Sequence, residues 1–248
     1  MKRASQKYLF LGDTHGDLDF VKSAGTLARD HGAEIIQLGD WGFIFPESSQ
    51  LSALSHMLVG FGVTMRFVDG NHDDHRSLKK LRRRTCSRGV AIAKNVIYQP
   101  RGSVHEDEEG TRFLFLGGAS SIHRASLTEG QDWWPEETIT EAEFKRALLA
   151  RGPFHVLVTH DAPAYPPGFK AKGSRSYQRA QSLSMRRIDT LIKKHRPAQH
   201  LHGHWHVRYE NRHAVGTVIT GLDCNTIDPE YLDESTLLWT RQELSQVP

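Results

Sequence analysis

Short apolar segments alternate with amphipathic segments along most of the chain. Six apolar segments have the length and residue types of buried strands, namely residues 8–11, 34–38, 64–68, 112–116, 154–159 and 199–201. Five other segments have the apolar spacing of helices that cover a core, namely residues 18–29, 51–61, 76–84, 140–151 and 177–195. Further strands are expected at residues 206–210, 216–220 and 236–240. This alternation predicts an α/β fold in which much of the sheet is parallel.

No internal repeat, low-complexity tract or linker divides the 248 residues, so we expect a single domain over residues 1–248. A hydrophobic content of 38% supplies a core and excludes a disordered chain. The mean hydropathy is -0.51, and no apolar run approaches the roughly 18 to 20 residues of a membrane span. The basic start leads into only a short apolar run, unlike a signal peptide. We therefore expect a cytoplasmic protein without a membrane partner.

Charge and cysteine content exclude two further classes of protein. The net charge is only +3, from 32 Lys and Arg against 29 Asp and Glu, which does not indicate a general nucleic-acid coating function. The two cysteines, Cys86 and Cys224, are too few for a disulfide framework or a thiolate metal site. Histidine is the unusual residue, with 15 copies. Where the histidines fall therefore becomes the informative question.

Polar side chains follow five of the predicted strands directly. The segments after the strands read Gly-Asp-Thr-His-Gly-Asp, Gly-Asp-Trp-Gly, Asp-Gly-Asn-His-Asp, Thr-His-Asp and Gly-His-Trp-His. The polar residues that we single out there are Asp13, His15, Asp40, Asn71, His160, His204 and His206. In open α/β sheets, ligands bind at the carboxyl ends of the strands. The sequence therefore predicts that these side chains meet at one edge.

Carboxylate, imidazole and amide groups form a nitrogen and oxygen ligand set that suits Mn, Fe, Zn, Co or Ni rather than a soft-metal thiolate site. Seven groups exceed the three or four that one ion usually takes from protein. If the groups converge, two metals that share a bridging carboxylate are the simplest interpretation. Two ions about 3.5 to 4 Å apart can clamp a phosphoryl group and generate a hydroxide.

In their order along the chain, these motifs resemble those of the calcineurin-like binuclear metallophosphoesterases. The family pattern is Asp-x-His, Gly-Asp, Gly-Asn-His-Asp/Glu, a single His and Gly-His-x-His, and here it extends from the first predicted strand to beyond residue 200. The resemblance implies a four-layer α/β/β/α sandwich of two mixed sheets. It also implies that two divalent metals lie at one sheet edge, with Mn²⁺ favoured and Fe, Zn, Ni or Co as alternatives.

The resemblance further implies roles for individual residues. One metal would be held by Asp13, His15 and His206 and the other by Asn71, His160 and His204, with Asp40 shared between the two. His72 would contact the phosphate and protonate the leaving oxygen, while a hydroxide activated by the two metals attacks phosphorus. Metal-ligating imidazoles usually need hydrogen-bond partners, and Asp17 and Asp73 are candidates for that role.

The chain departs from the Ser/Thr protein phosphatases of this family in two places. Those enzymes carry a phosphate-binding Arg before Gly-Asn-His-Glu, where this chain has Asp69. They also continue their second motif to Asp-Arg-Gly, so the Asp that orients the proton donor is not visible here. An anionic Asp69 near the site is expected to disfavour a dianionic monoester more than a monoanionic diester. Gly-His-Trp-His is likewise typical of the phosphodiesterase and nuclease branches.

We therefore predict a phosphodiesterase that acts on a nucleotide, a cyclic nucleotide or a nucleic acid. A phosphomonoesterase or protein phosphatase, or a dinucleoside-polyphosphate hydrolase, remains an alternative on the same scaffold. A binding module without catalysis is a third hypothesis, although every ligand position is filled.

Further residues are candidates for substrate contact or for the structure around the site. The tryptophans that either stack on a base or pack in the core, with the core favoured, are Trp41, Trp133, Trp134 and Trp205. The cations that either face solvent or bind a nucleotide phosphate are Arg83, Arg84, Lys170, Lys172 and Arg175. His200 and His202 alternate to the same side of one strand and are interpreted as structural or as partners of the ligands.

Overall fold

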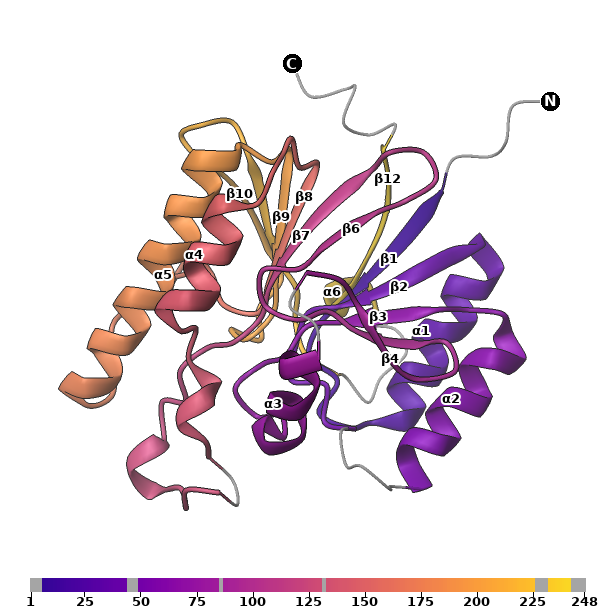
Figure 1. The fold of residues 1–248 in the computed structure, drawn as a ribbon, viewed down its shortest axis with the longest axis horizontal. Helices are drawn as coiled ribbons and strands as arrows, with labels where there is room; N and C mark the ends of the chain where they lie inside the picture. Colours follow the sequence, from indigo (N-terminus) through magenta and orange to yellow (C-terminus); the bar gives the residue numbers. More distant parts are fainter. Residues whose placement is uncertain (1–5, 44–48, 85–86, 131–132, 226–231, 242–248) are drawn as a thin grey trace.

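A computed structural model describes residues 6–43, 49–84, 87–130, 133–225 and 232–241 of the protein (Figure 1). Its helices are α1 (Leu18–His31), α2 (Ser49–Phe61), α3 (His75–Arg84), α4 (Glu141–Leu149), α5 (Arg175–His195) and α6 (Leu232–Ser235). Two 3₁₀ turns are η1 (Arg124–Ser126) and η2 (Pro135–Glu137). The five helices expected from the sequence are all present, within two residues at each end.

The strands form two mixed sheets of six. The first has the order β12-β1-β2-β3-β5-β4 and consists of β12 (Thr236–Thr240), β1 (Lys7–Leu11), β2 (Ala33–Gln37), β3 (Met65–Phe67), β5 (Val96–Tyr98) and β4 (Val90–Ala93). The second has the order β10-β11-β9-β8-β7-β6 and consists of β10 (Tyr209–Arg212), β11 (Val218–Gly221), β9 (Gln199–His202), β8 (Val156–Thr159), β7 (Arg112–Leu116) and β6 (Val104–Glu106).

Each sheet has a parallel centre and antiparallel edges. In the first sheet β1, β2, β3 and β5 run parallel, and β12 and β4 pair antiparallel at the two sides. In the second sheet β7, β8, β9 and β11 run parallel between antiparallel β6 and β10. The parallel strands of one sheet end at the same edge, which places the loops after them together.

Alternation along the strands builds the layers. In β1, Tyr8 and Phe10 face a core shared with the second sheet, whereas Leu9 and Leu11 face a core shared with α1 and α2. In the second sheet, Leu114 and Leu116 of β7 pack in a third core with α4 and α5. Figure 1 shows α1 and α2 outside one sheet and α4 and α5 outside the other. The predicted four-layer α/β/β/α sandwich is confirmed.

Local signals set the ends of the helices next to the site. Asp17 caps α1 by accepting the backbone N–H groups of Asp19 and Phe20, and Gly32 ends the helix in the left-handed conformation. Thr140 and Glu143 form a reciprocal capping box at the start of α4. These caps fix where the preceding loops enter the helices.

The main differences from the expected strands lie in residues 90–106 and 206–210. β4, β5 and β6 were not expected, because they are only three or four residues long and most of their positions are partly or fully exposed, so no alternation stands out. β10 begins at Tyr209 instead of residue 206, because His204 and His206 occupy turn conformations before it. In the described part of the chain, every helix is too short or too polar to cross a membrane.

Candidate metal centre

The polar residues singled out from the sequence converge where the parallel strands end. They come from the loops after β1, β2 and β3 of the first sheet and after β8 and β9 of the second, and α3 starts beside them (Figure 1). Six of them form two groups in which the ligand atoms all lie within 4.8 Å of one another. One group is Asp13, His15 and His206, and the other is Asp40, His160 and His204.

In the first group the ligand atoms lie close around Asp13. The Nε2 of His206 is 3.0 Å from the Asp13 Oδ2 and 3.3 Å from the His15 Nε2. The His15 Nε2 is 4.0 Å from the same Asp13 oxygen. Asp13 is fully buried, whereas both imidazoles reach the surface. The group is therefore open to solvent on its imidazole side.

The second group surrounds Asp40 and lies deeper. The His160 Nε2 is 3.4 Å from the Asp40 Oδ2 and 3.3 Å from the Asn71 Oδ1. The rings of His160 and His204 have centroids 5.0 Å apart. Asp40, Asn71 and His160 are each at most 2% exposed. Asn71 thus adds an amide oxygen to this group, as the sequence led us to expect.

These distances fit cations that the groups would share. Two ligands about 2.0 to 2.2 Å from one ion lie about 3.0 to 3.5 Å apart at tetrahedral or octahedral angles. The closest contacts in each group, from 3.0 to 3.4 Å, fall in this range. The donor set of carboxylates, imidazoles and one amide also suits a borderline divalent ion. The residues present therefore fit two divalent cations.

The backbone at the site is held in unusual conformations. Four of the proposed ligands have positive φ angles, namely His15 (44°), Asp40 (51°), His204 (67°) and His206 (48°). Non-glycine residues rarely adopt this region, and such strain concentrates at functional sites. The sharp turns let residues that directly follow a strand turn their side chains back over the sheet edge.

Burial and charge shift the pKa values of the second group in opposite directions. Burial raises the pKa of Asp40, but the neighbouring His160, His72 and His15 outweigh it and hold the pKa well below its usual range. Burial lowers the pKa of His160, and the carboxylates of Asp40 and Asp13 overcome this and raise it to about 10. Without a cation, the buried carboxylate and the imidazole thus neutralise each other.

The two histidines of the Gly-His-Trp-His motif differ from each other. Burial beside His160 lowers the pKa of His204 to about 3, so this ring is neutral. Hydrogen bonds with Asp13 and then with the Cys224 thiol raise the pKa of His206 to about 10. Cys224, for which the sequence indicated no role, therefore lies next to the proposed ligand His206. Cys86 lies outside the described residues.

His160 is oriented by the loop that carries Asp40. Its Nδ1 lies 2.8 Å from the Leu38 carbonyl oxygen, which can only accept, so Nδ1 carries a proton and Nε2 is the nitrogen that faces the group. Gly39 makes this approach possible. A Cβ at this position would lie 2.4 Å from the His160 Nδ1, and the φ of +100° also requires glycine.

The loop of His204 and His206 is attached to its surroundings on two sides. The His204 backbone N–H lies 3.1 and 3.2 Å from the two Asp13 carboxylate oxygens. The indole N–H of Trp205 donates to the Asp161 Oδ1 at 3.1 Å, and Gln181 of α5 donates to the same carboxylate. The buried Asp161 thus connects the motif to helix α5.

His72, the residue implied to be the proton donor, lies on the exposed side of the site. Its backbone N–H donates to the Asp40 Oδ1 at 2.8 Å, and its ring centroid is 6.0 Å from that of His15. Within the described residues, no carboxylate is hydrogen-bonded to the ring. The ring therefore reaches the open face of the site, and an orienting Asp is absent from its described surroundings.

The structure corrects the role expected for Asp17 and Asp73. Asp17 caps α1 and lies 3.4 Å from the Asn225 amide nitrogen. Asp73 accepts the backbone N–H groups of Gly42 and Gly70 at 2.9 and 2.7 Å. Their hydrogen bonds in the described structure thus go to backbone groups and one amide, and not to ligating imidazoles. Asp73 instead connects the loops that carry Asp40 and Asn71.

Asp69 also differs from what its place in the motif suggests. Its carboxylate is fully buried and accepts hydrogen bonds from Arg101 at 2.6 and 2.8 Å and from the Tyr98 hydroxyl at 2.8 Å. The charge is neutralised inside the protein, so it cannot repel a dianionic substrate as expected. That argument for diester preference is wrong.

Two residues behind Asn71 were missed in the sequence. The Asn71 Nδ2 donates to the Ser121 Oγ at 3.2 Å, and the Ser121 hydroxyl donates to the Glu137 Oε2 at 2.6 Å. A signal for Ser121 existed, since the predicted strand at 112–116 is followed by Gly-Gly-Ala-Ser-Ser, in which Ser121 is the last residue. Glu137, in a 3₁₀ turn of an acidic segment, carried no such signal.

Two of the four candidate tryptophans pack in the interior, and Trp134 is half-buried. Trp41 is fully buried and stacks on Phe67 with centroids 4.0 Å apart, and Trp133 lies under the Arg124 guanidinium. Trp205 differs, because it contacts the rings of Tyr165 and Phe169 beside the His204 loop. Core packing thus describes Trp41 and Trp133, whereas Trp205 belongs to the site.

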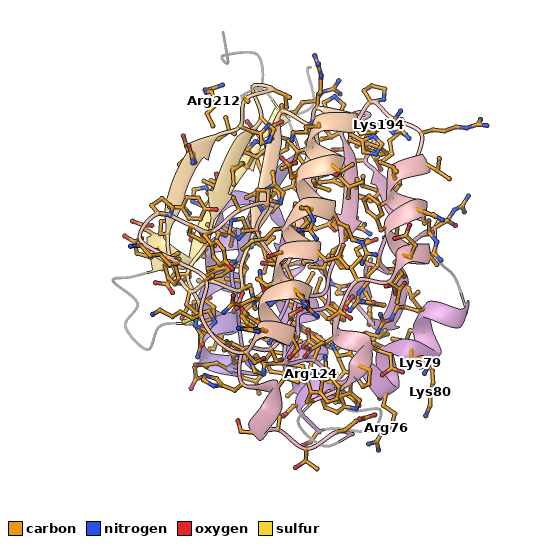
Figure 2. All side chains as sticks on the ribbon, turned by 90° about the vertical axis from the view of Figure 1, so that its left-hand side faces the viewer. Arg76, Lys79, Lys80, Arg124, Lys194 and Arg212 are labelled. Carbon is orange, nitrogen blue, oxygen red and sulfur yellow. The ribbon has the colours of Figure 1, made fainter. Side chains whose placement is uncertain are left out.

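Three basic side chains of α3 lie at one end of the molecule, and the side chains of the candidates Arg83 and Arg84 are outside the described part of the structure. Figure 2 shows Arg76, Lys79 and Lys80 together there, far from Lys194 and Arg212 at the other end. Lys79 pairs with Glu136 at 2.5 Å, and Arg76 donates to the Gly130 carbonyl oxygen. These two cations thus connect α3 to Gly130 and Glu136.

The two histidines of β9 belong to the structure around the site. Both are fully buried, and their ring centroids are 5.5 Å apart, as alternation along the strand predicted. The His200 Nε2 lies 2.8 Å from the Thr159 hydroxyl oxygen, and the His202 Nε2 lies 2.7 Å from the Tyr209 hydroxyl oxygen.

The sequence profile described as calcineurin-like phosphoesterase matches residues 6–208. The chain belongs to the calcineurin-like phosphoesterase family. The predicted enzyme class, a binuclear metallophosphoesterase that hydrolyses phosphoric esters, is confirmed at the level of the family. No curated protein shows significant similarity to the chain.

Solved structures share the fold of this phosphoesterase at low sequence identity. A dimetal phosphatase from Danio rerio matches with a TM-score of 0.60 and 11% identity, covering 96% of this chain and 93% of that one. A protein of Thermus thermophilus, TT1561, matches with a TM-score of 0.53 and 16% identity, covering 96% and 99%. GAP50, described as the anchor in the inner membrane complex of Plasmodium, matches with a TM-score of 0.50 and 13% identity, covering 95% and 78%.

Proposed function

We propose that the protein is a phosphodiesterase that depends on two divalent cations, with Mn²⁺ favoured, and that it cleaves a phosphodiester bond of a nucleotide, cyclic nucleotide or nucleic acid. The observation that carries the proposal is the convergence of two ligand groups, each within 4.8 Å, around the buried Asp13 and Asp40. A cytoplasmic location and a single domain remain predictions from the sequence.

In this proposal the first cation is held by Asp13, His15 and His206 and the second by Asn71, His160 and His204, with Asp40 shared. The 3.4 Å contact of Asp40 with His160 and the hydrogen bond of its other oxygen with the His72 N–H hold the carboxylate in a defined orientation. When bound, two divalent cations neutralise charge on the phosphoryl oxygens and lower the pKa of a water molecule.

The chain's own residues supply the remaining chemistry. His72 lies on the exposed face, where its imidazole can give a proton to the leaving oxygen of the ester. The backbone hydrogen bond from His72 to Asp40 holds the donor at the edge of the ligand groups. His204 is neutral and offers a lone pair, whereas His160 must lose the proton that Asp40 stabilises before its Nε2 can bind a cation.

Without the argument from Asp69, preference for a diester rests on two features. The Gly-His-Trp-His ending is typical of the diesterase branches of the family. The second feature is Arg101, which is fully buried. It donates hydrogen bonds to Asp69 in the Asn71 loop, to Glu143 and to three carbonyl oxygens. It is thus not available to bind the second charge of a monoester, and a monoanionic diester needs less cationic compensation.

A nucleotide substrate is supported by the loop between β8 and α5. Phe169 is 41% exposed and packs edge-to-face against Trp205, with ring centroids 5.3 Å apart. Trp205 in turn contacts the His204 ring. The exposed Lys170 and Lys172 lie next to Phe169 in the chain. An aromatic surface with adjacent cations suits a base and a phosphate.

The proposal is tested with metal-stripped protein reloaded with Mn²⁺, by comparing hydrolysis of bis-p-nitrophenyl phosphate and p-nitrophenyl phosphate. We expect the diester to be cleaved at least tenfold faster. Faster cleavage of the monoester would favour a phosphomonoesterase, and the search would then move to phosphatase and dinucleoside-polyphosphate substrates.

A binding module is the second candidate. It is favoured by the likeness to GAP50, whose description names an anchor and not an enzyme. Protein that binds Mn²⁺ but turns over neither ester, nor any cyclic nucleotide or short nucleic acid, would support this candidate. The complete ligand set argues for turnover.

A further inference from the structure

The two ends of the Asn71 amide have nearly the same shape but opposite chemistry, and only Oδ1 can bind a cation. Nδ2 lies 3.2 Å from the Ser121 Oγ, and Oδ1 lies 3.3 Å from the His160 Nε2. The orientation of this amide therefore decides whether Asn71 offers the second group an oxygen ligand or points its two N–H donors at the cation.

Ser121 and Glu137 determine which end points inward. The Ser121 hydroxyl donates to the Glu137 Oε2 at 2.6 Å, and its backbone N–H donates to Oε1 at 3.0 Å. An ionised carboxylate only accepts hydrogen bonds, so the hydroxyl proton of Ser121 is committed to Glu137. The Ser121 Oγ then offers only lone pairs to Asn71, which must turn its NH₂ group outward and its oxygen toward His160.

Asn71, Ser121 and Glu137 are buried, and Arg101 holds the segments that carry them. Asn71, Ser121 and Glu137 are 2%, 4% and 0% exposed, so water does not compete for these hydrogen bonds. The Glu137 carbonyl oxygen accepts a hydrogen bond from the Arg101 Nη2 at 2.9 Å. Arg101 also binds Asp69, two residues before Asn71. The loop and the turn that orients its amide are thus held by one guanidinium.

We propose that Ser121 and Glu137 are positioning residues that fix the amide orientation of Asn71 and thereby the affinity of the second group for a divalent cation. This inference rests on the proposed function, because it concerns the same cation-dependent site. In the described structure, Ser121 and Glu137 do not contact the ligand imidazoles, so they act through Asn71.

The test is calorimetric titration of metal-free protein with Mn²⁺. Wild-type protein is expected to show two binding events. Ser121→Ala is expected to leave one event unchanged and to weaken the other by about 10- to 100-fold, as is usual when the partner of a ligand is removed. Glu137→Gln, which keeps the volume but offers an N–H donor to the Ser121 oxygen, should weaken the same event.

The neighbouring serine provides a matched control. Ser120 is 3% exposed, and its Oγ has no hydrogen-bond partner among the described residues, so Ser120→Ala should bind Mn²⁺ like wild type. In an Asn71→Ala background, Ser121→Ala should weaken binding by less than about twofold more, because a residue that acts only through Asn71 has nothing left to orient.

Two results would overturn the inference. One is wild-type affinity for both ions in Ser121→Ala, or in Glu137→Gln if the alanine variant does not fold. The other is a loss in the Asn71→Ala background as large as in wild type. Failure of the proposed function is distinguishable, because wild-type protein itself would then bind fewer than two ions or leave phosphoesters intact.

Discussion

Arg101 and Asp69 form a fully buried ion pair, in which Nε and Nη2 of the guanidinium lie 2.8 and 2.6 Å from the same Asp69 oxygen. The Tyr98 hydroxyl binds the other oxygen at 2.8 Å. Arg101 also donates to Glu143 and to the carbonyl oxygens of residues 136–138. The pair therefore anchors the Asn71 loop to the turn that precedes α4.

Removing Arg101 should destabilise the protein strongly. Arg101→Met leaves Asp69 buried without its cation, which costs about 3 to 5 kcal/mol of the free energy of unfolding. Urea denaturation measures this loss. The control is Lys193→Met, which breaks the exposed pair with Asp189 and should cost less than about 1 kcal/mol. Equal, small effects of the two variants would show that the buried pair does not anchor the loop.

Acid should weaken the same network. Burial raises the pKa of Glu143, but the charges of Arg101 and Arg82 outweigh it and lower the pKa to about 2. A lowered folded-state pKa adds stability that is complete above the unfolded value near 4.5 and is lost as the pH falls toward 2. Between pH 5 and 2, the free energy of unfolding of Glu143→Gln should therefore decline less steeply than that of the wild-type protein. An unchanged slope would argue against the pairing.

The ligand assignment is tested by Asp40→Ala and Asn71→Ala. Each removes a buried oxygen from the second group, and Asp40 is also the carboxylate proposed to be shared. Both variants should lose Mn²⁺-dependent turnover by at least about 100-fold, measured with bis-p-nitrophenyl phosphate. Turnover at the wild-type rate would refute the assignment.

His72→Ala separates proton donation from cation binding. A general acid contributes about 10² to 10⁴ in rate, but a good leaving group such as p-nitrophenolate needs little protonation. The variant should therefore lose far more activity on a nucleotide diester with an alkoxide leaving group than on the nitrophenyl ester. His56→Ala, on the exposed face of α2, is the control. Equal losses on both substrates would exclude His72 as the acid.

Gly39→Ala tests whether the loop after β2 must approach His160 as closely as it does. The added Cβ would lie 2.4 Å from the His160 Nδ1, at a φ of +100°. We expect Mn²⁺ affinity to fall at least about tenfold, since the imidazole must move. Gly60→Ala, where a Cβ meets no atom within 4 Å inside α2, should bind Mn²⁺ normally and be slightly more stable.

The sequence predicted the ends of the strands that carry the candidate residues, because each of these strands stops abruptly at polar residues and four of the five do so beside a glycine. Asp40, for example, directly follows Gly39 at the end of β2, and its side chain lies where the Gly-Asp pattern implied. Short strands such as β6 (Val104–Glu106) were invisible, because three partly exposed residues carry no periodicity. Pairing with β7 holds β6 in the sheet, and such pairing cannot be read from a local pattern.

The direction of a side chain was harder to predict than its place. Asp69 stands in the motif beside Asn71, but its partner Arg101 is 32 residues away and comes from a turn with no recognisable signal. Glu137 likewise reaches Ser121 across 16 residues. The proposed ligands can thus be located from strand ends, whereas the residues that hold them depend on tertiary contacts between loops.

If two divalent cations act together at Asp40, the activity must depend on how many Mn²⁺ ions each chain binds, and a titration of activity with Mn²⁺ measures this dependence. Metal-free protein receives increasing equivalents of Mn²⁺, and hydrolysis of bis-p-nitrophenyl phosphate is recorded with the number of ions bound per chain. We expect little turnover with one ion bound and full turnover with two. Full turnover with one ion, or turnover without any ion, would contradict this expectation.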